Sequence, residues 1–215
     1  MIPVKICGLQ NTEDLNVSIK YGASWGGLVF YNKSIRSINI LKGKELAKHS
    51  QNRLAIVALF VNPKESLIDN VITNVKPDLI QFHGYETPEM CKDVFKRFGI
   101  PIIKAIQVSK KEDLKIAKLY SGKVNKILFD TKLDTNKLLG KSKKTIDWNI
   151  FKNLDINNEW ILAGGLNINN IKNAISISKA KAIDISSGVE SKPGKKNSDL
   201  IKNFLSKVKI MYQGN

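Results

Sequence analysis

The chain has 215 residues, of which 42% are hydrophobic and 25% are charged, as is usual for a folded domain. This length suits one well-buried domain and is short for two, so we expect a single domain over residues 1–215. No apolar run approaches the roughly 20 residues that cross a bilayer, and the first residues do not resemble a signal peptide. We therefore expect a cytoplasmic protein with no membrane partner.

The formal net charge is +16, from 35 basic and 19 acidic residues, and a charge of this size can indicate a nucleic-acid partner. The lysines, however, are spread along the chain, with short clusters only at 141–144 and 192–196, and aromatic residues are not interleaved with them. Charge alone is weak support for nucleic-acid binding. We expect no nucleic-acid partner, and a basic surface that attracts an anionic substrate.

Cysteine and histidine are rare in this chain, which has Cys7, Cys91, His49 and His83. Two cysteines do not form a disulfide framework, and no spacing of Cys or His resembles a zinc site. The sequence therefore predicts no bound metal.

Short apolar runs alternate with amphipathic segments along the chain, and their continuous Ile, Leu and Val content is typical of strands buried on both faces of a parallel sheet. The predicted strands are 4–7, 25–30, 55–61, 79–82, 102–106, 126–129, 160–163 and 182–185. Helix start signals lie between them at Asn11, Pro63, Pro88 and Asn167. The last predicted helix has an apolar face made by Ile201, Phe204, Leu205 and Val208.

Eight strands, each followed by a helical segment, predict an α/β protein with a (β/α)8 TIM barrel. A doubly wound open sheet is the alternative. It usually has fewer repeats and often a Gly-x-Gly-x-x-Gly turn after its first strand, which this sequence lacks.

Chemistry in such barrels lies at the carboxyl ends of the strands, where this sequence places polar side chains. The residues expected at these ends are Cys7, Arg36, Asn62, His83, Gln107 and Asp130. Strands seven and eight run instead into Gly164-Gly165 and Ser186-Ser187-Gly188. Two neighbouring turns of small residues expose backbone N–H groups that suit a phosphate. We expect Cys7, Asp130 and Arg36 to lie across the barrel mouth from these turns.

The chain resembles the phosphoribosylanthranilate isomerase family in a series of motifs that occur in order over nearly its whole length. The matching segments are 5–9 (KICGL), 26–30 (GGLVF), 34–36 (SIR), 59–62 (LFVN), 81–84 (QFHG), 127–130 (ILFD), 146–148 (IDW), 163–167 (AGGLN), 184–190 and 193–194. The resemblance implies a cofactor-free isomerase of tryptophan biosynthesis with a phosphorylated small-molecule substrate. Such an enzyme opens the ribose ring of N-(5-phosphoribosyl)anthranilate and forms 1-(2-carboxyphenylamino)-1-deoxyribulose 5-phosphate by an Amadori rearrangement. We expect a monomer or a homodimer.

The resemblance also implies roles for three residues. Cys7 matches the general base, which needs a thiol whose pKa is lowered by nearby positive charge; an isolated cysteine is more often a buried structural one. Asp130 matches the general acid that protonates the ring oxygen, although an Asp after a strand is often a helix N-cap. Arg36 matches the residue that binds the anthranilate carboxylate, because a guanidinium binds a planar carboxylate through two hydrogen bonds; the alternative is a solvated surface arginine.

By the same resemblance Gly165, Ser186, Ser187 and Gly188 hold the phosphate, mainly through backbone N–H groups, with the serine hydroxyls as further donors. Ordinary tight turns are the alternative. His83 lines the pocket or is a structural histidine, and Asp184 has no assigned role. Cys91 has helical spacing and belongs to the core.

The sequence departs from the family at three places. The family has a glycine-rich loop where residues 138–148 here contain one glycine and three lysines, which suggests a less supple lid. Ile35 and Asn197 replace a usual proline and aspartate. Three alternatives remain: a histidine-pathway aminoaldose isomerase, which needs Asp where Cys7 stands, a basic nucleic-acid-binding barrel, and a barrel without activity.

Overall fold

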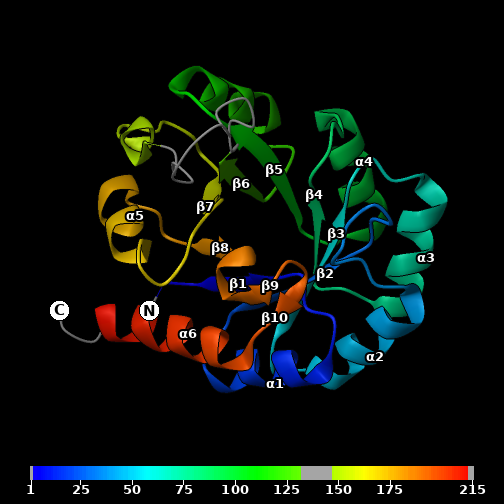
Figure 1. Cartoon of the computed structure of the whole chain (residues 1–215). Helices are drawn as coiled ribbons and strands as arrows, with labels where there is room; N and C mark the ends of the chain where they lie inside the picture. Colours follow the sequence, from blue (N-terminus) through cyan, green and yellow to red (C-terminus); the bar gives the residue numbers. More distant parts are fainter. Residues whose placement is uncertain (1, 132–146, 213–215) are drawn as a thin grey trace.

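The computed structural model describes residues 2–131 and 147–212, and its strands close into a parallel eight-stranded barrel surrounded by helices (Figure 1). Each strand pairs with the next in the sequence, and β8 pairs with β1 to close the ring. The predicted barrel is therefore confirmed. Its strands are β1 (Val4–Cys7), β2 (Trp25–Val29), β3 (Ala55–Phe60), β4 (Leu79–Phe82), β5 (Ile102–Val108), β6 (Lys126–Thr131), β7 (Glu159–Ala163) and β8 (Ile183–Ile185).

Strands β5 and β6 run further than their apolar residues predict. Gln107 and Asp130 lie inside them, directly paired across the two strands, and not after the strand ends as expected. The hydrophobic run marks only the part of a strand that is covered on both faces. Polar residues can continue the ladder where the inner face opens into the barrel mouth.

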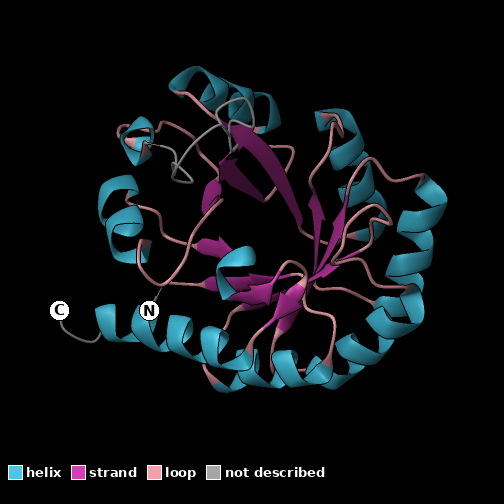
Figure 2. Cartoon of the chain, in the orientation of Figure 1, coloured by secondary structure: helices cyan, strands magenta, loops and turns pink. Residues whose placement is uncertain are grey.

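The helices cover the outside of the barrel (Figure 2). Four begin where the sequence predicts a start signal or shortly after it: Asn11 caps α1 by accepting from the Asp14 N–H at 2.8 Å, and Pro88 is the first residue of α4. Their bounds are α1 (Thr12–Lys20), α2 (Ile40–Ser50), α3 (Glu65–Val75), α4 (Pro88–Phe98), α5 (Ile171–Ser178) and α6 (Ser198–Met211). Among the described residues, no helix is long and apolar enough to cross a membrane.

One detail of the helix prediction is wrong. Asn167 is not the N-cap of α5; Asn170 is, and Asn167 Oδ1 instead accepts from the N–H groups of Asn169 and Asn170 in a turn before the helix. Strand β5 is followed by a 3₁₀ helix, η1 (Lys111–Tyr120), whose buried residues Leu114, Ala117 and Tyr120 recur every third position and so match its tighter winding.

Alternate side chains of the strands pack in separate clusters on the two faces of the barrel wall. Val57, Leu79, Ile103, Leu128 and Ile161 fill the inside of the barrel, whereas the larger cluster between barrel and helices takes the neighbouring strand positions. At the carboxyl ends of the strands, a small third cluster of Cys7, Val29 and Leu59 lines one part of the barrel mouth, and Gln107 and Asp130 add polar side chains to it.

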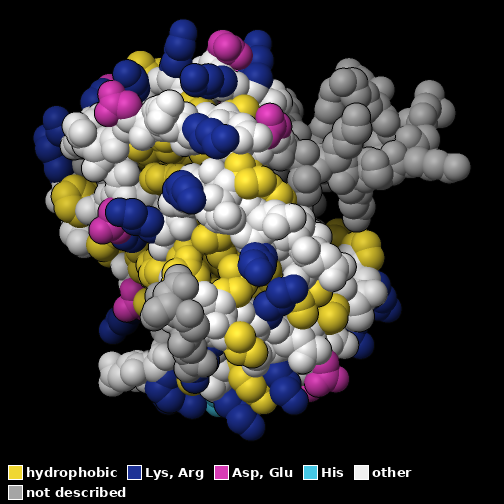
Figure 3. Space-filling view, turned by 90° about the vertical axis from the view of Figure 1, so that its left-hand side faces the viewer, with side chains coloured by type: hydrophobic (Ala, Val, Ile, Leu, Met, Phe, Trp, Pro, Cys, Tyr) yellow, Lys and Arg dark blue, Asp and Glu magenta, His cyan; other side chains and the backbone are white. Residues whose placement is uncertain are grey.

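A short hairpin of β9 (Glu190–Lys192) and β10 (Lys195–Lys196) follows η4 (Ser187–Val189) and precedes α6. In Figure 3, lysine and arginine side chains are distributed from the top to the bottom of the face shown, with hydrophobic and other side chains between them. This distribution agrees with the scattered lysines of the sequence.

Candidate active site

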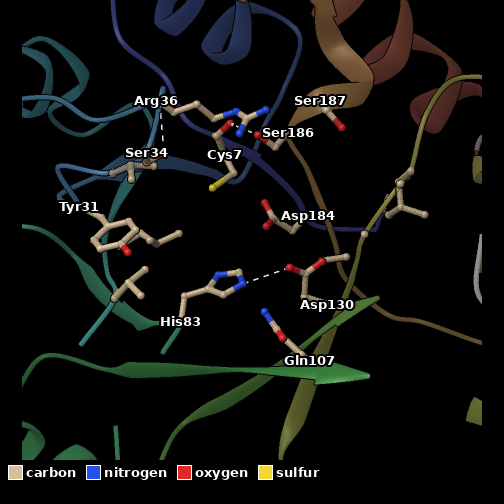
Figure 4. Close-up of a pocket in the computed structure, with 17 residues that line it drawn as sticks. Cys7, Tyr31, Ser34, Arg36, His83, Gln107, Asp130, Asp184, Ser186 and Ser187 are labelled. Carbon is tan, nitrogen blue, oxygen red and sulfur yellow. Dashed lines mark hydrogen bonds and ion pairs between the residues drawn. The ribbon is translucent and has the colours of Figure 1, made fainter. Parts of the chain in front are cut away.

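A cavity of about 460 Å³ opens at the carboxyl ends of the strands (Figure 4). All but one of the residues proposed from the sequence line it: Cys7, Arg36, His83, Asp130, Gly165, Ser186 and Ser187. Residues from six different strands or the loops after them thus meet at one place. The barrel closure makes this possible, because it brings all carboxyl ends to one rim.

Gly188 is the one proposed residue that does not line the cavity. A Cβ atom at this position would collide with the backbone oxygen of Leu166. Gly188 therefore lets the turn after β8 lie directly against the turn after β7, and its position explains the glycine without a direct ligand contact.

The turn after β7 has the left-handed backbone that glycine permits, with φ of 90° at Gly164 and 63° at Gly165. Among the described residues, the backbone N–H groups of Gly165 and Ser187 have no hydrogen-bond acceptor. They are therefore available to an anion. The Ser186 hydroxyl is different, because it donates to the Cys7 carbonyl oxygen at 3.0 Å and is already used inside the protein.

Cys7 ends β1 with its side chain turned inward and nearly buried. A Cβ atom at Gly27, on the neighbouring strand, would lie 3.1 Å from both Cys7 Sγ and Lys5 Nζ, so the thiol and the ammonium converge on the same glycine. Burial raises the pKa of the Cys7 thiol, and Lys5 opposes this rise. Desolvation thus outweighs the nearby positive charges, and the pKa of the thiol lies above its ordinary value rather than below it, as a general base would need.

Lys5 lies one layer below Cys7 and is fully buried inside the barrel. Its ammonium donates to Asp184 Oδ1 on β8 at 3.1 Å. Burial by itself would lower the pKa of Lys5, but Asp184 and Cys7 together raise it above its ordinary value. Sequence reasoning missed this pair, although a lysine two positions before Cys7 in a strand must share its face.

Asp130 in β6 is held by a histidine that follows β4, two strands away. His83 Nε2 donates to Asp130 Oδ2 at 3.0 Å, while Gln81 Nε2 donates to His83 Nδ1 at 3.0 Å. Because Nδ1 accepts, the ring hydrogen is on Nε2 and faces the carboxylate. Asp130 lies inside β6 and is therefore not the N-cap of a helix, and among the described residues no hydrogen-bond donor contacts its second carboxylate oxygen.

Arg36 is not a solvated surface residue. Its stem lies over Gly8, where a Cβ atom would be 2.6 Å from Arg36 Cδ. Its Nε and Nη2 atoms donate to the two oxygens of Glu190 at 2.6 and 2.8 Å. The guanidinium thus already holds one carboxylate, from a residue that sequence reasoning left without a role.

Cys7 and Arg36 do not lie across the mouth from the turn after β8, contrary to expectation. Figure 4 shows them beside Ser186 at one end of the cavity, with His83 and Asp130 at the other. The reason is the closure of the barrel, since β8 pairs with β1 and the first and last strand ends become neighbours. Of Cys7, Arg36 and Asp130, only Asp130 lies away from the turn after β8.

A profile of the N-(5'phosphoribosyl)anthranilate (PRA) isomerase family matches residues 4–207. The chain belongs to the phosphoribosylanthranilate isomerase family. It is 38% identical over 205 residues to the N-(5'-phosphoribosyl)anthranilate isomerase of Paramagnetospirillum magneticum, covering 95% of each chain. The crystal structure of phosphoribosyl anthranilate isomerase from Thermotoga maritima is similar, with a TM-score of 0.87 and 38% identity over 97% of this chain and 99% of that one. Another structure of this isomerase, in complex with reduced 1-(o-carboxyphenylamino)-1-deoxyribulose 5-phosphate, has a TM-score of 0.82 and 34% identity over the same shares, 97% and 99%.

The resemblance to phosphoribosylanthranilate isomerase is therefore confirmed for the family and the fold. The lysine-containing segment that replaces the family's glycine-rich loop lies mostly outside the described residues, which resume at residue 147. Asn62, expected at the rim, instead holds the turn after β4 by accepting from the Tyr85 N–H at 2.7 Å. In the described part of the chain, no three His, Cys, Asp or Glu side chains are grouped as metal ligands.

Proposed function

We propose that this chain converts N-(5-phosphoribosyl)anthranilate to 1-(2-carboxyphenylamino)-1-deoxyribulose 5-phosphate in tryptophan biosynthesis. One observation carries the proposal within the family: a thiol and a carboxyl group, Cys7 and Asp130, face one cavity that Arg36 and two turns with available N–H groups also line. An Amadori rearrangement needs one acid and one base on a substrate held at both anionic ends. The residues around this cavity can supply each of these parts.

Asp130 is the proposed general acid. It gives its proton to the furanose oxygen as the bond from C1 to that oxygen breaks, and the lone pair of the anthranilate nitrogen forms the C=N bond. The carboxylate that remains accepts the hydrogen bond from His83 Nε2. Because that bond strengthens as charge develops on Asp130, His83 assists the proton transfer.

Cys7 is the proposed general base. Its thiolate removes the proton from C2; the electrons of that bond form the C1=C2 bond, and those of the C=N bond return to nitrogen. The enol then gains a proton at C1 and loses the hydroxyl proton at C2, which gives the ketone without net change in atoms or electrons. A thiol with a raised pKa is ionised less often but is a stronger base once ionised. Lys5 favours that ionised form.

The proposed binding groups hold the two ends of the substrate. Gly165 and Ser187 offer backbone N–H groups to the phosphate, and Gly188 supports this surface from behind by letting the two turns meet. Arg36 binds the anthranilate carboxylate. His83 lines the cavity and acts through Asp130.

The test is a fluorescence assay of phosphoribosylanthranilate consumption with the variants Cys7→Ala and Asp130→Asn. Each removes one proton-transfer group, so each should lower kcat by at least about 100-fold while the far-ultraviolet circular dichroism stays unchanged. Near-normal turnover in either folded variant would contradict the assignment of that residue.

We further propose that the protein works in the cytoplasm as a monomer or homodimer, without a nucleic-acid partner. A T. maritima relative with a TM-score of 0.79 and 34% identity is described as a monomer made from a dimeric enzyme, which supports both states as stable forms of this fold. Sedimentation at micromolar concentration measures the state of this chain. If the protein bound random duplex DNA with a steep dependence on salt, the proposed absence of a nucleic-acid partner would be contradicted.

A further inference from the structure

A guanidinium can bind two carboxylates at once, one along its Nε and Nη2 edge and one along its Nη1 and Nη2 edge. In Arg36 the first edge is occupied by both oxygens of Glu190. Among the described residues, no acceptor contacts Nη1, and Arg36 lines the cavity. Arg36 therefore has one edge fixed by the protein and one edge left for a ligand.

Glu190 is itself held on several sides. Lys196 Nζ donates to its Oε1 at 2.7 Å, and the Gly194 N–H donates to its Oε2 at 3.1 Å. The side chains of Glu190 and Lys196 are only 3% and 2% exposed. Lys196 Nζ also lies 3.1 and 3.2 Å from the carbonyl oxygen and hydroxyl of Ser186. A continuous buried chain of contacts thus joins Arg36 to the turn after β8.

The backbone around Arg36 leaves it little freedom. Gly194, with φ of 81°, ends the hairpin turn where a Cβ atom would lie 3.2 Å from the Ile35 carbonyl oxygen. Gly8 makes room for the stem of Arg36 on the other side. The loop of Arg36 thus lies so close to Gly8 on one side and to Gly194 of the hairpin on the other that a side chain at either glycine would crowd it.

The charges of this chain of contacts sum to an excess of one positive charge. Arg36 and Lys196 carry two cations and Glu190 one anion, so a ligand carboxylate would meet a net attraction even though Glu190 is present. A buried charge cluster is not the strongest way to anchor a hairpin, since apolar side chains of similar volume often stabilise as well or better. Its place beside the cavity therefore points to a role in binding.

We propose that Glu190 and Lys196 are positioning residues that orient Arg36 toward the substrate carboxylate and fix it relative to the turn at Ser186. They make the site selective for a phosphorylated glycosylamine that carries a carboxylate ortho to its nitrogen. This inference rests on the proposed function. The proposed function assigns Arg36 as the residue that contacts the carboxylate. The inference adds the residues that determine which edge of the Arg36 guanidinium faces the substrate.

The experiment measures dissociation constants by calorimetry for two stable ligands. One is the reduced product, 1-(2-carboxyphenylamino)-1-deoxyribitol 5-phosphate, and the other is the same molecule without the carboxylate. Glu190→Gln should weaken binding of the first by about 10-fold or more and change the second by less than about 2-fold, because only the first uses the oriented edge of Arg36. Lys196→Met should show the same selectivity with a smaller loss, since it removes one charge and leaves the contact of Glu190 with Arg36.

A matched control is Glu86→Gln. Glu86 likewise has a nearly buried side chain and a lysine partner, Lys104 Nζ at 3.0 Å, and it does not line the cavity. In the Glu86→Gln variant, the ratio of the dissociation constants for the two ligands should equal the ratio in the unmodified protein. In an Arg36→Met background, Glu190→Gln should have no further effect on the carboxylated ligand, because it acts through Arg36.

The inference would be overturned if Glu190→Gln weakened the binding of both ligands equally, or weakened the binding of neither. A full effect of Glu190→Gln in the Arg36→Met background would also overturn it. If Glu190→Gln does not fold, Lys196→Met carries the same comparison. Failure of the proposed function is distinguishable, because the unmodified protein would then bind neither ligand and would not turn over phosphoribosylanthranilate.

Discussion

Lys5 and Cys7 are two positions apart in β1, so their side chains share the inner face of the barrel and both approach Gly27. The charge next to the thiol comes from Lys5 on its own strand and from Asp184 on β8, with Lys196 and Arg36 further along the same end of the cavity. Lys5 is the principal group that counteracts the burial of Cys7. The ionised fraction of the proposed base should therefore depend on it.

The double variant Lys5→Met/Asp184→Asn tests this dependence without leaving a buried charge unpaired. We expect the pKa of Cys7 to rise further, so that alkylation of Cys7 by iodoacetamide at pH 7 becomes about 10-fold slower or more. Mass spectrometry of the two cysteine peptides measures the rate as a function of pH.

Cys91 is an internal control for that measurement, because burial raises its pKa to about 12 and its thiol should stay unreactive in both proteins. Lys104→Met/Glu86→Gln removes an equally buried pair away from the cavity and should leave the Cys7 profile unchanged. An unaltered profile in the Lys5 variant would show that Lys5 does not influence the thiol.

At the scale of elements, the phosphate surface depends on two turns that touch. The turn after β7 carries Gly164 and Gly165, and the turn after β8 carries Ser187 and Gly188. Each strand end was predictable, because an apolar run stops at small residues. The direct contact between the two turns was not predictable. Strands β7 and β8 share only the pair Leu162 and Ile183, and the turns approach each other beyond that pair.

Gly188→Ala should separate the two turns. The added Cβ would collide with the Leu166 carbonyl oxygen, which should cost about 1–3 kcal/mol of folding free energy and weaken competitive inhibition by inorganic phosphate. Urea unfolding and inhibition constants measure the two effects.

Gly122→Ala is the matched control for this prediction. Gly122 also has a positive φ, 69°, but a Cβ atom there meets nothing within 4 Å. It should therefore lose about 1 kcal/mol of stability and leave phosphate inhibition unchanged. Equal inhibition by phosphate in both variants and the unmodified protein would argue against the phosphate role of these turns.

At the scale of the whole molecule, the contacts of Glu190 join distant parts of the sequence. Arg36 follows β2 and Glu190 follows β8, 154 positions apart, and their ion pair lies at the rim where the barrel closes. Burial by itself would raise the pKa of Glu190, but hydrogen bonds from Arg36 and Lys196 outweigh it and lower this pKa to about 2.

This lowered pKa predicts how stability depends on pH. An ionised Glu190 stabilises the folded state fully above its unfolded pKa of about 4.5, and the contribution is lost as the pH falls through about 2. The difference in unfolding free energy between the unmodified protein and Glu190→Gln should therefore shrink between pH 4.5 and 2, by no more than about 3 kcal/mol.

Thermal unfolding of both proteins at a series of pH values measures this difference. Glu45→Gln, which removes an exposed carboxylate in contact with Lys42, is the control and should show little dependence. A difference that stays constant from pH 7 to pH 2 would contradict the assigned ion pair.

The barrel could be predicted from the amino-acid sequence, because eight apolar runs, spaced for helices between them, leave few other ways to bury both faces of the strands. The sequence also shows which residue types stand at the strand ends, and the family that they indicate. Which of these side chains contact each other could not be predicted and is a result of the folded arrangement. Closure of β8 on β1 places Ser186 against Cys7, and the hairpin after β8 brings Glu190 to Arg36. Such contacts depend on the angle at which separate segments return to one rim, whereas periodicity along a chain reports only which face of its own element a residue occupies.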